Sequence, residues 1–337
     1  MNLLLVLKGI AMGIAETIPG VSGGTIAFIT GIYEKLLESI KAFTPSLIGT
    51  WKKEGFKAVW QKINGSFLVA LLGGMVVGIG IGIVVVEKLL KNYPPVVWAF
   101  FLGLIIASII YVGKQISKWN LAPIVALVLG AVIAFGITLL PIGEVNESLW
   151  FVFVCGAIAV SALILPGISG SFILLLMGMY SYILHDTLKE GLLSNHEVGA
   201  LVTMVVFGLG MIVGLVTMSR FLTWSLKNHS DVTLAILTGF MLGALNKLWP
   251  WNIPTKVMDS NDVILDFTKG MEYDKVITVT STSPAGYLEN FGKPDFLIPA
   301  LVFFVLGIVM VLGLDKFSSK LLVAGFLAEE IVKYKRS

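Results

Sequence analysis

Charged residues are scarce in this chain. Asp, Glu, Lys and Arg make up only 13% of its 337 residues, whereas 56% are hydrophobic. Water-soluble domains carry about 25% charged and about 45–50% apolar residues. The composition therefore excludes an ordinary soluble domain and predicts a polytopic, all-α membrane protein.

Cysteine and histidine are also rare. The one cysteine, Cys155, excludes an internal disulfide and a cysteine metal cluster, and its apolar surroundings predict a packed, unreactive thiol. The three histidines are scattered, so neither a metal site nor a cofactor is expected. The net charge of +3 is small and spread along the chain, which gives no support for a nucleic-acid partner.

Two polar, helix-breaking stretches stand inside apolar sequence. The first covers residues 16–25 and the second residues 165–171. Their Pro, Gly and Ser residues lie 147 positions apart: Pro19 matches Pro166, Gly20 matches Gly167, Ser22 matches Ser169 and Gly23 matches Gly170. Non-helical backbone at membrane depth survives only when protein or a water-filled cavity satisfies its amides. We therefore expect two re-entrant helical hairpins, each with its turn near the middle of the membrane.

Six apolar runs are candidates for membrane spans. Three follow the first turn and three follow the second, and the match between the halves continues through them at a spacing of 136. Because an odd number of spans separates the turns, the hairpins enter from opposite faces, which predicts two inverted repeats. The repeats are expected over residues 1–147 and 148–337. The runs lie at about 66–86, 95–112, 121–140, 199–219, 232–249 and 296–314.

Lysine distribution predicts the orientation. Residues 34–64 carry six lysines interleaved with Trp and Phe, which is typical of a cytoplasmic segment lying on anionic head groups. The polar insert 251–294 then falls on the opposite side, where its β-prone run 276–280 predicts a small extracytoplasmic cap or a long loop. Residues 321–332 are too short and too acidic for a clear span and are assigned to the interface.

The paired turns have the chemistry of an anion site. A helix that begins at mid-membrane directs free N–H groups and the positive end of its dipole toward the centre of the protein. Glycines let the backbone approach a ligand, and hydroxyls add donors, which suits a phosphate or a carboxylate. The alternative is that the glycines only permit close helix packing. The candidate phosphate-binding residues are Pro19, Gly20, Ser22, Gly23, Gly24, Thr25, Pro166, Gly167, Ser169, Gly170 and Ser171.

Two charged residues are further candidates. Glu16 precedes the first turn, and position 163 in the second half is leucine. A carboxyl group inside a membrane is costly, so Glu16 is a candidate for proton coupling; the alternative is that it caps amides of the turn. Arg220, which we place at the end of a span, is a candidate counter-charge for phosphate, with snorkelling to the interface as the alternative.

These residues resemble a bacterial membrane family regarded as polyprenyl-phosphate transporters (PopT-like). The matching stretches are the two turns and residues 234–251, and the likeness covers nearly the whole chain except the insert 251–294. The resemblance implies a multi-pass protein of the bacterial cytoplasmic membrane that returns undecaprenyl phosphate from the outer to the inner leaflet. It implies a transporter rather than an enzyme, with the lipid and the bilayer as partners; a homo-oligomer is compatible with it.

Two other functions share some of these features. The acidic residue before a Pro-x-Ser turn also resembles a membrane undecaprenyl-diphosphate phosphatase. That chemistry needs a histidine or a second glutamate beside the serine, and Thr25 and Phe172 stand where the histidine is expected. A transporter of small soluble anions would fit the same turns.

Overall fold

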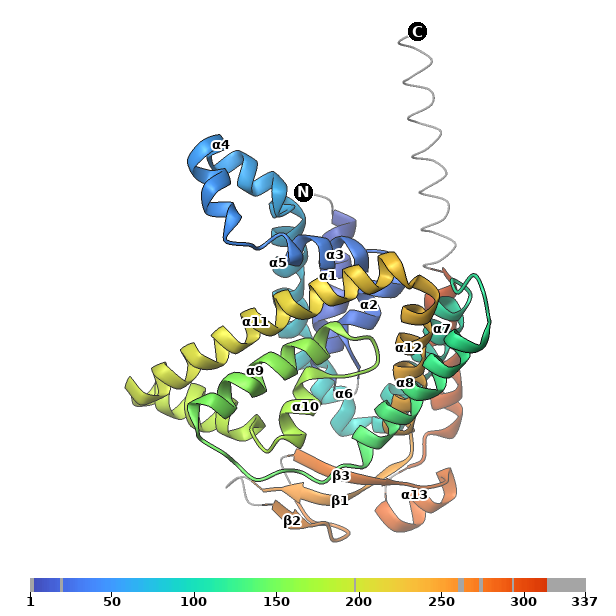
Figure 1. Ribbon diagram of the computed structural model, residues 1–337. Coiled ribbons are helices and arrows are strands. Elements are labelled where there is room, and N and C mark those ends of the chain that lie inside the picture. Colours follow the sequence, from blue (N-terminus) through green and yellow to red (C-terminus); the bar gives the residue numbers. More distant parts are fainter. Residues whose placement is uncertain are drawn as a thin grey trace. The chain divides into compact units, whose positions relative to one another are not determined.

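The computed structural model describes residues 3–18, 21–196, 198–259, 264–272, 275–292 and 294–313. The described chain is mostly helical (Figure 1). Two compact units form: one holds residues 3–86 and 108–244, and the other holds residues 87–107 and 245–313. Each unit contains residues from both halves of the chain. The interfacial segment expected over residues 321–332 lies outside the described residues.

The first unit begins with two helices on either side of the first turn. These are α1 (Leu3–Glu16) and α2 (Gly23–Ile29), and α9 (Leu149–Ile164) and α10 (Gly170–Leu176) stand in the same way around the second turn. Each short helix has a serine as its N-cap and is followed, two residues after its end, by a glycine with positive φ, Gly31 or Gly178. The remaining helices of this unit are α3 (Tyr33–Lys41), α4 (Ser46–Lys62), α5 (Gly65–Ile81) with a π-helical segment Gly82–Val86, α8 (Leu121–Leu139), a π-helical segment Tyr182–Ser194, α11 (Val198–Asn228) and α12 (Ser230–Gly243).

The second unit combines helices with a small sheet. α6 (Glu87–Asn92), the first part of α7 (Pro94–Gly113), a 3-10 turn Ala244–Leu248 and a helix Leu297–Gly313 accompany strands β1 (Asn252–Met258), β2 (Ile264–Asp266) and β3 (Lys275–Ser281). The sheet is antiparallel in the order β2-β1-β3, and α13 (Pro284–Phe291) packs against β1. The β-prone run 276–280 lies in β3, so the insert is a folded element. Trp251 and Tyr287 of the insert pack with Ala99 of α7 and Ala300 of the helix Leu297–Gly313 in one buried cluster.

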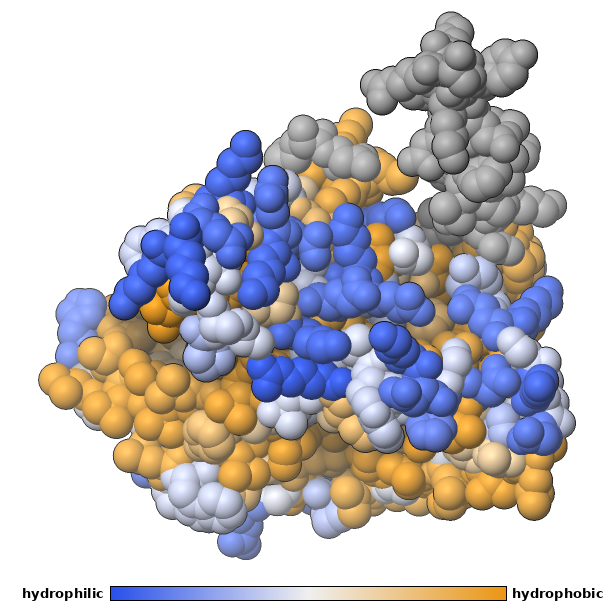
Figure 2. Space-filling model, turned by 45° about the horizontal axis from the view of Figure 1, so that its top comes forward, coloured by the Kyte–Doolittle hydropathy of each residue, from blue (hydrophilic) through white to orange (hydrophobic). Residues whose placement is uncertain are grey.

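Among the described residues, five helices are long and apolar enough to cross a membrane. They correspond to the first five expected spans, and the sixth, Leu297–Gly313, is apolar but described over a shorter length. Hydrophobic residues cover much of the visible surface (Figure 2). These helices identify the chain as a multi-pass membrane protein. The five helices are Gly65–Asn92, Pro94–Gly113, Leu121–Leu139, Val198–Asn228 and Ser230–Leu248.

The same helix packing occurs twice in the first unit. A Cβ atom added at Gly74 of α5 would overlap the carbonyl oxygen of Val6 in α1, and one added at Gly210 of α11 would overlap that of Phe153 in α9. Val6 and Phe153 are 147 positions apart, and Gly74 and Gly210 are 136 apart, which are the two spacings found in the sequence. The backbones of both helix pairs therefore touch at equivalent positions. The same holds for Gly78 with Ile10 and Gly214 with Ala157, and for Gly9 with Leu71 and Gly156 with Phe207.

The later helices pack across the two halves of the sequence. In the first unit α12 lies beside α8, where Gly239 meets the backbone of Leu127 (Figure 1). In the second unit α7 lies beside Leu297–Gly313, where Gly103 meets the backbone of Phe304. Gly103 and Gly239 are again 136 positions apart. Each of these two glycines therefore contacts a helix from the opposite half of the sequence.

Candidate functional site

The first turn is built around Ser22. This residue has extended backbone angles and caps α2, because its Oγ accepts a hydrogen bond from the Gly24 amide at 3.0 Å. Such a cap satisfies one of the N–H groups that a helix leaves free at its start. Ser22 and Thr25 are both completely buried. Pro19 and Gly20 lie outside the described residues.

Glu16 ends α1 and reaches back to the start of α2. Its Oε1 accepts a hydrogen bond from the Gly23 amide at 2.6 Å. A Cβ atom at position 23 would crowd this carboxyl group, so glycine allows the close approach. The capping interaction weighed from the sequence is therefore present. The proton-coupling hypothesis stays a prediction.

Lys8 holds the other end of α2, and sequence reasoning missed it. Its Nζ donates a hydrogen bond to the carbonyl oxygen of Thr30 at 2.6 Å. The lysine thus lies at the negative end of the short helix and the carboxylate of Glu16 at the positive end, which is the favourable arrangement at both. The available signal was a lysine eight residues before Glu16, a little over two helical turns away and about 80° around the helix axis.

The second turn repeats this geometry without the charges. Ser169 caps α10, with its Oγ 3.4 Å from the Phe172 amide and 2.9 Å from the Oγ of Ser171. Gly167 has φ of +84°, and a Cβ there would overlap the backbone of Met241. Pro166 is buried between the end of α9 and this glycine.

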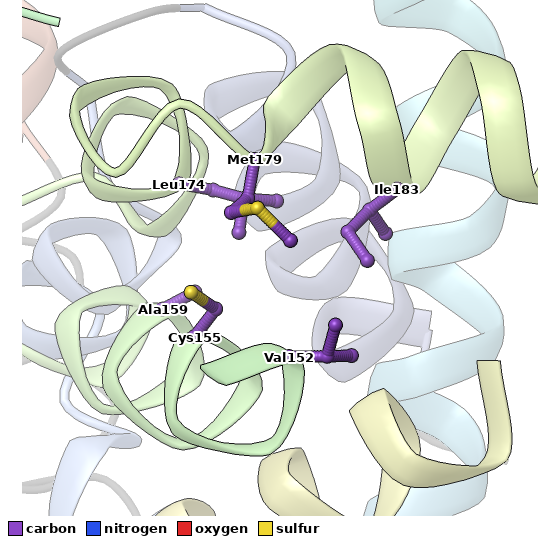
Figure 3. Packing of buried hydrophobic residues seen from close by; sticks show 6 residues of the cluster. All are labelled: Val152, Cys155, Ala159, Leu174, Met179 and Ile183. Carbon is purple, nitrogen blue, oxygen red and sulfur yellow. The ribbon is translucent and has the colours of Figure 1, made fainter. Parts of the chain in front are cut away.

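The positions equivalent to Lys8 and Glu16 are Cys155 and Leu163. Cys155 is completely buried and packs with Val152, Ala159, Leu174, Met179 and Ile183 (Figure 3). The predicted packing of this thiol in apolar surroundings is therefore confirmed. Apolar packing stands here in place of the Lys8 contact, so of the two short helices it is α2 that has charged side chains bound at both ends.

The two turns contact each other directly. The Ser22 hydroxyl donates to the carbonyl oxygen of Leu163 at 3.0 Å, and the amide of Gly167 donates to Thr25 Oγ1 at 3.2 Å. The Tyr33 hydroxyl, which follows α2, donates to the carbonyl oxygen of Ile164 at 3.2 Å. Stretches that are about 140 residues apart in sequence thus form one polar cluster in an apolar protein.

Close backbone contact accounts for the glycines of the cluster. A Cβ atom at Gly24 would overlap the carbonyl oxygen of Ile164, and one at Gly170 would overlap that of Ala159. The Gly24 contact joins the two halves, whereas the Gly170 contact lies within the second hairpin. Close approach at Gly24 brings donors and acceptors of the two turns within reach of each other, as buried amides and carbonyls require. The glycines at positions 24 and 170 therefore serve close packing.

Arg220 is not joined to this cluster by any contact of the described residues. It is exposed on α11, which continues to Asn228 instead of ending near residue 219. The expected span was too short at this end because Arg220 and Lys227 interrupt its apolar pattern. Of the candidate residues, the structure gathers Glu16, Ser22, Gly23, Gly24, Thr25, Pro166, Gly167, Ser169, Gly170 and Ser171 into the two turns.

Comparison with known proteins identifies relatives along most of the chain. Residues 12–264 match the model of a VCA0040-like family described as undecaprenyl phosphate translocase-like. A polyprenyl-phosphate transporter of Vibrio cholerae is 40% identical over 316 residues, covering 93% of this chain and 96% of its own. A polyprenyl-phosphate transporter of Staphylococcus aureus is 30% identical over 265 residues, covering 75% of this chain and 88% of its own. No solved structure matches the chain.

The matched region includes both turns and the helices that hold them. It begins within α1, four residues before Glu16, and extends beyond α12 into the insert. The family model and both relatives agree, and together they confirm the resemblance seen in the two turns. The chain belongs to the undecaprenyl phosphate translocase-like family.

Proposed function

We propose that this protein moves undecaprenyl phosphate, the lipid carrier of cell-wall sugars, from the outer to the inner leaflet of the bacterial cytoplasmic membrane. Family membership and the names of two relatives support transport of a polyprenyl phosphate. A phosphate cannot cross hydrocarbon without a large desolvation cost. The protein supplies a polar route for this head group while the polyprenyl tail stays in lipid.

The proposed architecture is a pair of inverted repeats, residues 1–147 and 148–337, each with one re-entrant turn. The equivalent glycine contacts of α1 with α5 and of α9 with α11 support a repeat. Three candidate spans lie between the turns, and this odd number favours opposite orientations of the two hairpins. In this arrangement segment 34–64 is cytoplasmic and the insert 251–294 is extracytoplasmic.

We place the phosphate at the paired turns. The observation that carries this proposal is their direct contact, which puts hydroxyls and amides of both halves into one buried cluster. The Glu16 carboxylate already accepts from the Gly23 amide, so an anionic oxygen fits that position. When Glu16 moves away, a phosphate oxygen accepts the hydrogen bond from the Gly23 amide. The Ser22 hydroxyl then binds the phosphate in place of its partners in the protein.

Glu16 is the proposed coupling group. Protonation removes the negative charge that holds the carboxyl at the positive end of α2, and the amide then becomes available to the substrate. Release of the proton restores the original contact and favours departure of the phosphate. Only the first turn carries such a group, because Leu163 stands at the equivalent position.

The proposal is tested by leaflet exchange of undecaprenyl phosphate in proteoliposomes, with free phosphate measured in parallel. The parent protein should accelerate exchange without releasing phosphate. Ser22→Leu and Ser169→Leu should abolish exchange because each inserts a bulky apolar group into the cluster. Ser117→Leu, at an exposed position, is the matched control and should leave exchange unchanged.

Each alternative function has its own outcome in this assay. Vesicles that carry undecaprenyl diphosphate test the first alternative, because phosphate released from this lipid would identify a phosphatase. Uptake of soluble phosphate without lipid exchange would identify a transporter of small anions. If both leucine variants exchange lipid as fast as the parent, the phosphate does not bind at the turns. The proposed transport function would still stand.

A further inference from the structure

Helix α4 is a helical hairpin. Its chain reverses at Gly55, where φ is +77° and ψ is 177°, and the Lys62 Nζ on the second arm donates to Thr50 Oγ1 on the first at 3.3 Å. No residue of α4 is buried, and the neighbour against which it packs is α5. Most of its side chains are therefore exposed, and Figure 1 shows the hairpin projecting beyond the start of α5.

The tip of the hairpin combines large apolar and basic side chains. Trp51 is 61% exposed and Phe56 is 64% exposed, and both flank the reversal at Gly55. Four lysines against one glutamate give residues 46–62 an excess of positive charge, and these lysines are exposed as well. Figure 2 shows hydrophilic side chains gathered in the region of α4 beside hydrophobic ones. Aromatic groups among lysines are typical of a surface that sits in a lipid interface.

The hairpin is fixed next to a membrane span. Its second arm ends three residues before α5, which opens the candidate span Gly65–Asn92. The Trp60 Nε1 donates to Ser66 Oγ at 3.0 Å, and the Trp60 ring lies against Gly65. Because α5 enters the bilayer at this point, the base of the hairpin is at the boundary of lipid and water, and its tip is within reach of the head groups.

We infer that residues 46–62 form a docking hairpin for the membrane surface, recognising anionic phospholipid head groups. Lys52, Lys53 and Lys57 bind the phosphates, while Trp51 and Phe56 enter the boundary between head groups and acyl chains. This inference does not depend on the proposed transport function, because it concerns the bulk lipid beside α5 and not the paired turns.

A fluorescent label at the tip tests the inference. The variant Glu54→Cys can be labelled with an environment-sensitive thiol dye, since the natural Cys155 is buried. In vesicles with about one third anionic lipid, its emission should shift to the blue and be quenched by brominated lipid; neutral vesicles should give a much smaller effect. Replacing Lys52, Lys53 and Lys57 by Gln should reverse the shift. Each lysine removed should lower the docking equilibrium constant about fivefold.

The matched control removes three exposed lysines elsewhere, at Lys88, Lys91 and Lys114, and should keep the shift. High salt should weaken the shift in the parent because it screens the head groups. Emission that is the same in neutral and anionic vesicles, or is unchanged by the hairpin substitutions, would overturn the inference. A label that stays exposed to water in both vesicle types would overturn it in favour of a soluble protein as the partner of the tip.

Discussion

The Ser22 hydroxyl donates a hydrogen bond to the carbonyl oxygen of Leu163 at 3.0 Å. Leu163 occupies, in the second half of the chain, the position that Glu16 occupies in the first. Leu163, which has no carboxyl group, thus binds through its backbone carbonyl to the turn that follows Glu16. This contact ties the two halves together at the centre of the candidate site.

Removal of the Ser22 hydroxyl should destabilise the protein. Ser22→Ala leaves the Gly24 amide and the Leu163 carbonyl without this partner in a fully buried place, which costs about 1–3 kcal/mol. Thermal unfolding in detergent should show a lower midpoint than the parent. Ser117→Ala, at an exposed position, is the control; equal midpoints for both variants would contradict the structural role of Ser22.

The repeated glycine contacts predict a matched set of effects. Gly74→Ala and Gly210→Ala force a Cβ into a backbone carbonyl and should each cost about 1–3 kcal/mol of stability. Gly73→Ala and Gly208→Ala have no atom within 4 Å of the new Cβ, so they should be neutral or slightly stabilising. Unfolding midpoints of the four variants provide the measurement. Similar values for both pairs would show that the close contacts carry no energy.

Two substitutions separate capping from proton exchange at Glu16. Glu16→Gln keeps an oxygen that can accept from the Gly23 amide but cannot exchange a proton. This variant should bind lipid and lose the dependence of transport on a pH gradient. Glu16→Leu, which copies the second half, should also lose stability because the amide loses its acceptor. Gradient-dependent transport by the glutamine variant, at the level of the parent, would exclude coupling through this residue.

Lys8 should control the local stability of α2. In Lys8→Met the Thr30 carbonyl loses its charged donor, and hydrogen bonds to charged groups contribute about 1.5–3 kcal/mol. Hydrogen exchange of the amides in α2 should then be roughly 10- to 100-fold faster, with smaller changes in α10. Lys41→Met, at an exposed position of α3, serves as the control. Unchanged exchange in α2 would mean that the lysine does not stabilise this helix.

Much of the helical framework was predictable from the sequence, because long apolar runs in lipid have few alternatives to helix. The position of the two turns was predictable for a related reason, since proline and glycine interrupt helices wherever they stand. The full length of α11 was not predictable, because Arg220 and Lys227 lower the hydropathy of its last turns. The role of Lys8 was also missed, as a single lysine in an apolar run does not reveal its acceptor.

The sequence by itself determined that the chain is an apolar, multi-pass protein with two matching Pro-Gly-Ser turns and a carboxyl group, Glu16, before the first turn alone. These are properties of composition and spacing, and they follow without any knowledge of contacts. Only the tertiary structure decided that the two turns are hydrogen-bonded partners, that Glu16 and Lys8 hold opposite ends of α2, and that α8 pairs with α12. Such choices depend on which backbones can approach each other, and this is decided by glycine contacts between segments far apart in the chain.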